Sequence, residues 1–93
     1  MKLAELMQDM SITRFRGNAD TEVTGITKDS RKVKAGYMFF ATNSSTAFIN
    51  DAHRRGAGVL VSDMELPNQF TSSVVVKDLK VSLGNVTSKF YGF

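Results

Sequence analysis

YMFFATNSSTAFINDAHRRGAGVLV, residues 37–61, is the stretch that decides the fold of this 93-residue chain. It opens with YMFFA, residues 37–41, a continuous apolar run bounded by Gly36 and by the polar segment 42–46. Strands that are covered on both faces of a sheet have this pattern, because neither side of the strand meets water. We therefore predict that residues 37–41 form the central strand of a sheet.

The rest of the same stretch predicts a helix and a second strand. Phe48, Ile49 and Ala52 fall at helical spacing, and the basic residues before Gly56 suit the C-terminal end of a helix. The run VLV, residues 59–61, then reads as the next strand. Strand, helix and strand in succession form a βαβ unit, whose right-handed crossover makes the two strands parallel. The sequence therefore predicts the α/β class.

The flanking segments extend this unit on both sides. Alternating or β-branched residues predict further strands at residues 11–15, 23–27 and 73–76. Two more helices are expected, one carrying the apolar stripe Leu3, Leu6, Met7 and Met10, and one that Asp78 caps and that runs to Gly92. Residues 29–36 and 63–71 read as loops or turns. The whole pattern predicts one domain, residues 1–93, with three α/β/α layers and a mainly parallel sheet.

The composition excludes several kinds of site. The chain has no cysteine and one histidine, His53, which removes thiolate chemistry and any multi-histidine metal site. We expect His53 to lie on the surface without a role as a base. No segment approaches the roughly 20 apolar residues that cross a bilayer, so no membrane partner is expected. The net charge of +3 permits an anionic partner without indicating nucleic acid.

One long segment resembles the opening of the Mur ligase family. Residues 24–41 read TGITKDSRKVKAGYMFFA: a glycine, a short strand, Asp-Ser-Arg, a gap, a glycine, and an aromatic-rich strand that ends in alanine. The resemblance continues in four further segments, residues 48–52, 56–62, 76–78 and 88–92. It thus covers essentially the whole chain. Within the family, the start and end of the chain are most similar to the ligase that acts on UDP-N-acetylmuramoyl-L-alanyl-D-glutamate.

The resemblance implies a role as the N-terminal, substrate-binding domain of a cytoplasmic enzyme of peptidoglycan precursor synthesis. In such ligases this domain holds the UDP end of the substrate, while a central domain binds ATP and Mg²⁺ and a C-terminal domain brings the amino acid. The family's phosphate-binding loop, Gly-x-x-Gly-x-Gly-Lys-Thr, is absent from this sequence. Without that loop the transferred phosphoryl group has no cradle. We therefore expect an excised domain that is inactive alone and whose partners are UDP-N-acetylmuramoyl-dipeptide and the central domain.

The family's substrate contacts carry over only in part. The resemblance assigns UDP binding to Lys28, Ser30 and Arg31, and to the loop that follows the central strand, Thr42, Asn43, Ser44 and Ser45. Hydroxyl groups and cations at the mouth of a strand-to-turn corner suit a diphosphate, and loops beyond the carboxyl ends of parallel strands commonly bind ligands. The second loop departs from the family pattern, because it is about four residues short and lacks glycine.

Two other functions compete with this assignment. The segment 34–40 has a superficial similarity to the aromatic strand of an RNA-recognition motif, whose spaced aromatic residues stack on bases. Phe39 and Phe40 are adjacent, however, and adjacent residues of a strand point to opposite faces. The other alternative is a small protein-interaction domain without a ligand, for which the shortened loop is the best support.

Overall fold

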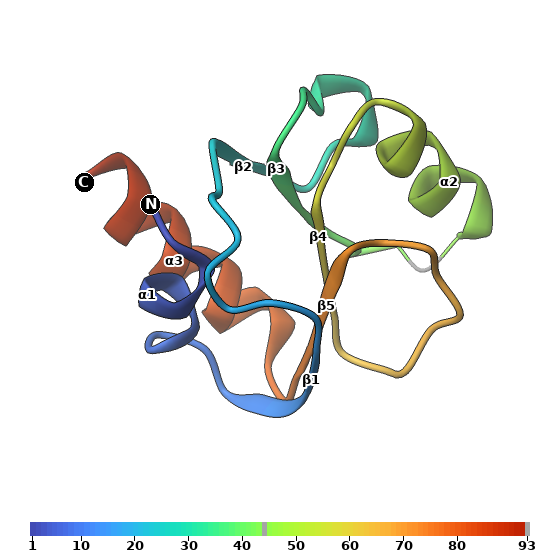
Figure 1. Ribbon diagram of the computed structural model, residues 1–93. Coiled ribbons are helices and arrows are strands. Elements are labelled where there is room, and N and C mark those ends of the chain that lie inside the picture. Colours follow the sequence, from blue (N-terminus) through green and yellow to red (C-terminus); the bar gives the residue numbers. More distant parts are fainter. Residues whose placement is uncertain (44, 93) are drawn as a thin grey trace.

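The computed structural model describes residues 1–43 and 45–92, which form a five-stranded sheet with helices on both faces (Figure 1). The elements, in chain order, are α1 (Leu3–Met7), β1 (Ile12–Arg16), β2 (Gly25–Thr27), the short 3-10 helix η1 (Ser30–Lys32), β3 (Tyr37–Phe40), α2 (Thr46–Arg54), β4 (Val59–Ser62), β5 (Ser72–Val76) and α3 (Leu79–Tyr91). Every predicted helix and strand is present. The predicted loop 29–36 contains only the single turn η1.

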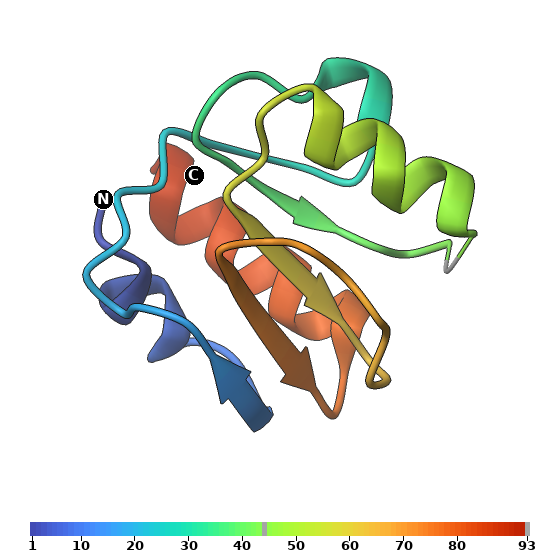
Figure 2. The same ribbon diagram turned by 45° about the vertical axis from the view of Figure 1, so that its right-hand side comes forward.

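The sheet has the strand order β1-β5-β4-β3-β2. Strands β2 to β5 run parallel, in agreement with the predicted mainly parallel sheet, and β1 pairs antiparallel with β5 (Figure 2). The pairing of β1 with β5 shifts in register between Ile12 and Arg14. The central strand is β4, whereas the sequence pattern favoured residues 37–41. That prediction is wrong because β3 and β4 are both buried on two faces, and burial does not reveal how many strands lie beyond each of them.

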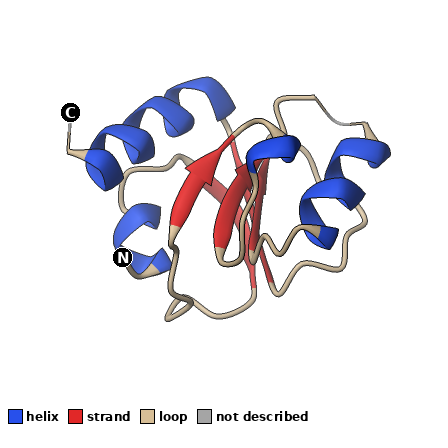
Figure 3. Cartoon of the chain, turned by 90° about the horizontal axis from the view of Figure 1, so that it is seen from above, coloured by secondary structure: helices blue, strands red, loops and turns tan. Residues whose placement is uncertain are grey.

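The helices form two layers around the sheet (Figure 3). Helices α1 and α3 cover one face, where their apolar side chains pack with Met38, Phe40 and Val61. Helix α2 covers the other face and packs on Phe39 and Leu60. The three-layer α/β/α arrangement is therefore confirmed. Both adjacent phenylalanines are buried, at 2% and 0% exposure, so neither offers a ring face on which RNA bases could stack.

Local chemistry explains where the last helix begins and ends. The Asp78 side chain accepts a hydrogen bond from the backbone N–H of Val81, which satisfies one of the free donors of the first turn of α3. Gly92 ends the helix in the left-handed conformation, at φ 77°, where an L side chain would be strained. Both termini of this helix agree with the sequence prediction.

Two predicted elements are shorter than expected. Helix α1 ends at Met7, and the backbone N–H of Met10 donates instead to the Met7 carbonyl in a tighter turn. Strand β2 begins at Gly25, because the N–H of Val23 donates to the carbonyl of Met1 and not to a strand of the sheet. Within the described residues, no helix is both long and apolar enough to span a bilayer.

Candidate functional site

Two of the predicted binding segments meet at one edge of the sheet. Strands β2 and β3 are parallel neighbours, so the residues that follow them emerge side by side at their carboxyl ends. The two segments enclose a cleft of about 420 Å³, lined by Lys28, Asp29, Ser30, Arg31, Phe39, Thr42, Asn43 and Phe48. We call this the β2–β3 cleft. It brings together five of the seven residues that the resemblance assigned to UDP binding.

The remaining two assigned residues lie elsewhere. Ser45 is the N-cap residue of α2, and its backbone N–H donates to the Asn43 side chain at 3.0 Å. It does not line the cleft. Ser44 is outside the described residues. The shortened loop therefore reaches the cleft through Thr42 and Asn43.

Asp29 organises the first wall of the cleft. Its carboxylate caps η1 by accepting from the backbone N–H of Arg31 at 3.0 Å, and it also accepts from the guanidinium of Arg31 at 3.0 and 2.9 Å. These hydrogen bonds, those of the guanidinium first, lower the pKa of Asp29 from 3.8 to about 2. The carboxylate is thus ionised in the cleft, and the charge of Arg31 is already paired.

Ser30 has a different environment from the one expected. Its side chain is buried, at 4% exposure, and faces the carboxylate of Asp51 in α2. The hydrogen bond from Arg55 is the largest cause of the lowered pKa of Asp51, and hydrogen bonds from Ser30 and Arg54 contribute further. At 4% exposure, Ser30 offers little accessible surface to a diphosphate oxygen.

Lys28 is the cation of the cleft that remains available. Its side chain is exposed, and within the described residues it makes no ion pair or side-chain hydrogen bond. Thr42 and Asn43 are also exposed, and the amide nitrogen of Asn43 keeps its two donors while its oxygen accepts from Ser45. The cleft therefore offers an ammonium group and neutral donors to an anion, an arrangement that suits phosphate oxygens.

Two aromatic residues complete the cleft. Phe48 was expected on the buried stripe of its helix, yet it is 46% exposed and turns its side chain to the cleft, whereas Ile49 and Ala52 are buried against the sheet. Phe39 forms part of the lining from beneath. The signal that could have identified Phe48 is its position: it lies one turn into α2, directly after the assigned loop. An exposed ring beside a cation suits a ligand that combines a flat ring with phosphate.

The described lining of the cleft supplies groups suited to binding. Among residues 1–43 and 45–92, no three histidine, cysteine, aspartate or glutamate side chains are grouped to hold a metal ion. His53 is exposed, as predicted, and lies outside the cleft lining. The arrangement can bind and orient a ligand.

No family model matches the chain, but individual proteins do. The chain is 32% identical over 99 residues to the UDP-N-acetylmuramoyl-L-alanyl-D-glutamate--2,6-diaminopimelate ligase of Bacteroides fragilis, covering 99% of the chain and 20% of that protein. It is 35% identical over 97 residues to the chloroplastic MurE homolog of Arabidopsis thaliana, covering 98% of the chain and 13% of that protein. The chain thus spans about a fifth or less of the length of these relatives.

A solved structure agrees with the sequence relatives. The fold matches MurF from Acinetobacter baumannii with a TM-score of 0.77 at 20% identity, over 94% of this chain and 20% of that one. At 20% identity, the structural match establishes only the fold. The similarity in sequence to Mur ligases comes from the relatives named above. The chain is therefore homologous, over nearly all of its length, to the N-terminal region of Mur ligases.

Proposed function

We propose that residues 1–93 act as the domain that binds the UDP part of UDP-N-acetylmuramoyl-L-Ala-D-Glu for a Mur ligase, and that the β2–β3 cleft is the binding site. The observation that carries the proposal is the convergence of Lys28, Ser30 and Arg31 with Thr42 and Asn43 around one cleft. Relatives named for ligation to this UDP-linked dipeptide support the choice of ligand.

In this proposal the diphosphate lies against Lys28 and the uracil ring lies near Phe48. The ammonium of Lys28 is the one cation of the lining without a carboxylate partner among the described residues. The side chains of Thr42 and Asn43 donate to the phosphate oxygens from the opposite wall. Because the site is open and makes few contacts, we expect binding of the isolated domain at about millimolar Kd.

The ATP-dependent formation of the amide bond is assigned to other domains of a longer protein. The residues present do not fit ATP and Mg²⁺: the sequence has no Gly-Lys-Thr run, and the described residues group no carboxylates that could hold a metal ion. These 93 residues alone are therefore expected to have no ligase activity. We place the parent enzyme in the cytoplasm, where ATP is available to it.

A titration with UDP, followed by backbone amide chemical shifts, tests the proposal. We expect saturable shifts at residues 28–31 and 42–43, and smaller effects from uridine because it lacks the diphosphate. Replacing the free cation, Lys28→Ala, should weaken UDP binding roughly fivefold to tenfold. Lys80→Ala, which removes an exposed lysine of α3 outside the cleft, is the matched control and should change nothing.

Two results would contradict the proposal. The first is the absence of saturable shifts at either segment with UDP well above millimolar concentration. The second is a response to single-stranded RNA in its place, which would favour the nucleic-acid alternative. Equal weakening by Lys28→Ala and Lys80→Ala would show only a general charge effect and would also reject the assigned site.

A further inference from the structure

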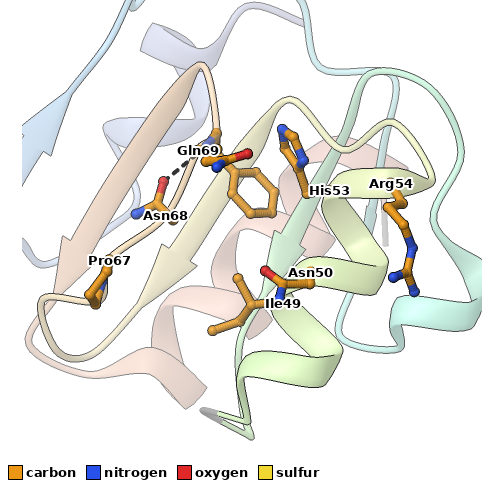
Figure 4. A pocket seen from close by; sticks show the side chains of 8 residues that line it. Ile49, Asn50, His53, Arg54, Pro67, Asn68 and Gln69 are labelled. Carbon is orange, nitrogen blue, oxygen red and sulfur yellow. Dashed lines mark hydrogen bonds between the residues drawn. The ribbon is translucent and has the colours of Figure 1, made fainter.

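A second cleft lies on the other side of α2, between that helix and the connection from β4 to β5 (Figure 4). Its volume is about 560 Å³, and it is lined by Ile49, Asn50, His53, Arg54, Pro67, Asn68, Gln69 and Phe70. It shares no lining residue with the β2–β3 cleft. We call it the α2 cleft, and nothing in the proposed function uses it.

Both walls of the α2 cleft are fixed by their own contacts. The Asn68 side chain accepts from Arg16 at 2.7 Å and from the backbone N–H of Phe70 at 3.1 Å, and donates to the Leu66 carbonyl at 2.8 Å. Arg16 also donates to the carbonyl of Phe70 at 3.0 Å, which ties the connection to β1. The opposite wall is α2, held on the sheet by Ile49. The cleft is therefore formed before any ligand arrives.

Three polar side chains of the cleft lining, those of Asn50, His53 and Gln69, are available to a ligand. Within the described part of the chain, the side chains of Asn50, His53 and Gln69 make no hydrogen bond to another residue, and the carboxamides of Asn50 and Gln69 each offer both a donor and an acceptor. Figure 4 shows Asn50 and His53 on the helix, with Gln69 on the facing connection. The guanidinium of Arg54 instead donates to Asp51 at 3.3 Å. The polar side chains of the α2 cleft therefore do not favour an anionic ligand.

The apolar part of the lining favours a flat ring. Ile49 and Phe70 are buried at 5% and 2% exposure, so their side chains form a floor. The imidazole of His53 lies edge-on to the Phe70 ring, with centroids 5.3 Å apart and an interplanar angle of 63°. This contact steadies the imidazole while His53 stays exposed, so one of its faces can stack on a ligand.

We propose that the α2 cleft binds the nucleobase of a nucleoside. The ring lies over Ile49 and beside His53, and the carboxamides of Asn50 and Gln69 contact its polar edge. A carboxamide places one donor beside one acceptor and so matches the adjacent donor and acceptor atoms of a base edge, as amide side chains do when they contact adenine. This site does not depend on the proposed UDP site, because α2 separates the two clefts.

Titrations of the 93-residue chain with adenosine and with uridine, monitored by amide shifts, test the proposal and identify the preferred base. We expect saturable shifts at residues 49–54 and 67–70 from at least one nucleoside. Gln69→Glu and Asn50→Asp keep the side-chain shape but replace the NH₂ donor, and each should weaken binding roughly fivefold. Gln8→Ala, which changes an exposed amide on the opposite side of the sheet, is the control and should leave binding unchanged.

Two results would overturn the proposal. One is the lack of saturable shifts at the α2 cleft with either nucleoside at about 10 mM, a concentration that would populate a millimolar site. The other is binding that Gln69→Glu and Asn50→Asp leave as strong as in the unmodified chain. A UDP response at residues 28–31 and 42–43 is read separately, so the failure of one site does not imply the failure of the other.

Discussion

The guanidinium of Arg31 is held by the carboxylate of Asp29, two residues earlier, through hydrogen bonds of 3.0 Å from Nε and 2.9 Å from Nη2. The same carboxylate caps η1 through the Arg31 backbone N–H. One aspartate thus sets the conformation of the turn and neutralises the nearest arginine of the β2–β3 cleft. Replacing Asp29 by asparagine would keep the cap of η1 but remove the charge that pairs with Arg31.

We expect Asp29→Asn to strengthen UDP binding severalfold. Asparagine caps helices about as well as aspartate, so the turn should persist, while the released guanidinium can turn to the diphosphate. Calorimetry or amide-shift titration would measure the change in Kd. Adding Arg31→Ala to Asp29→Asn should remove the gain; a gain that survives in the double variant would show that Arg31 is not its source.

Stability should fall in acid, partly through the same carboxylate. The pKa of Asp29 is about 2 in the folded chain against 3.8 ordinarily, so its ionised form favours folding at pH above 4 and that contribution is lost as the pH falls through about 2. The lowered pKa values of Glu22 and Asp51 act in the same direction. Urea midpoints should separate the unmodified chain from Asp29→Asn at pH 6 and converge near pH 2. A constant difference across this range would contradict the assignment.

Gly84→Ala should stabilise the fold. Gly84 lies inside α3 with an ordinary backbone conformation, and an added Cβ would meet no atom within 4 Å. Alanine restricts the unfolded chain and favours the helix, so we expect a gain of about 0.5–1 kcal/mol, or roughly 2–8 °C in Tm. Thermal unfolding would measure it.

Gly17→Ala is the control for Gly84→Ala, because the same substitution at this site should lower stability. Gly17 has φ 123°, and its added Cβ would lie 2.6 Å from the backbone Cα of Ser72. Alanine there should lower Tm, because both the conformation and the space are unsuitable. If the two substitutions shifted Tm in the same direction, the local explanation would fail.

Tyr91→Phe should expose the backbone of the β2 edge. The Tyr91 hydroxyl accepts from the N–H of Ile26 at 3.0 Å and donates to the Ile26 carbonyl at 3.4 Å. Removing it should cost about 1 kcal/mol and should accelerate hydrogen exchange at the Ile26 amide. The phenylalanine ring keeps the contact with Phe90, whose ring centroid is 4.8 Å away, so α3 should remain folded. An unchanged exchange rate at Ile26 would show that the contact is not maintained in solution.

Local sequence patterns were sufficient for most of the elements. The helical spacing before Gly56, the cap at Asp78 and the glycine at position 92 depend on neighbours within a few residues, and all three agree with the structure. The order of strands could not be read in this way. The central position of β4 and the antiparallel pairing of β1 with β5 both depend on pairing between distant segments.

The candidate site, like the fold, could be predicted from the sequence only in part. The convergence of residues 28–31 with 42–43 follows from two parallel strands ending at one edge, and the resemblance to Mur ligases had assigned both segments to one site. The contact of Ser30 with Asp51 could not be predicted, because it arises from the packing of η1 on α2, where Arg55 also donates to the Arg31 carbonyl at 3.4 Å. No sequence spacing encodes that packing.

Neither edge strand of the sheet is a regular template for an incoming strand. The Tyr91 hydroxyl blocks one edge, and the irregular pairing of β1 disturbs the other. At one margin the backbone groups of Ile26 are already occupied, and at the other the ladder is interrupted and carries the exposed cations Arg14 and Arg16. Features of this kind hinder the growth of a sheet from one molecule into the next. The molecule should therefore resist fibrillar aggregation at the protein concentrations that amide-shift measurements require.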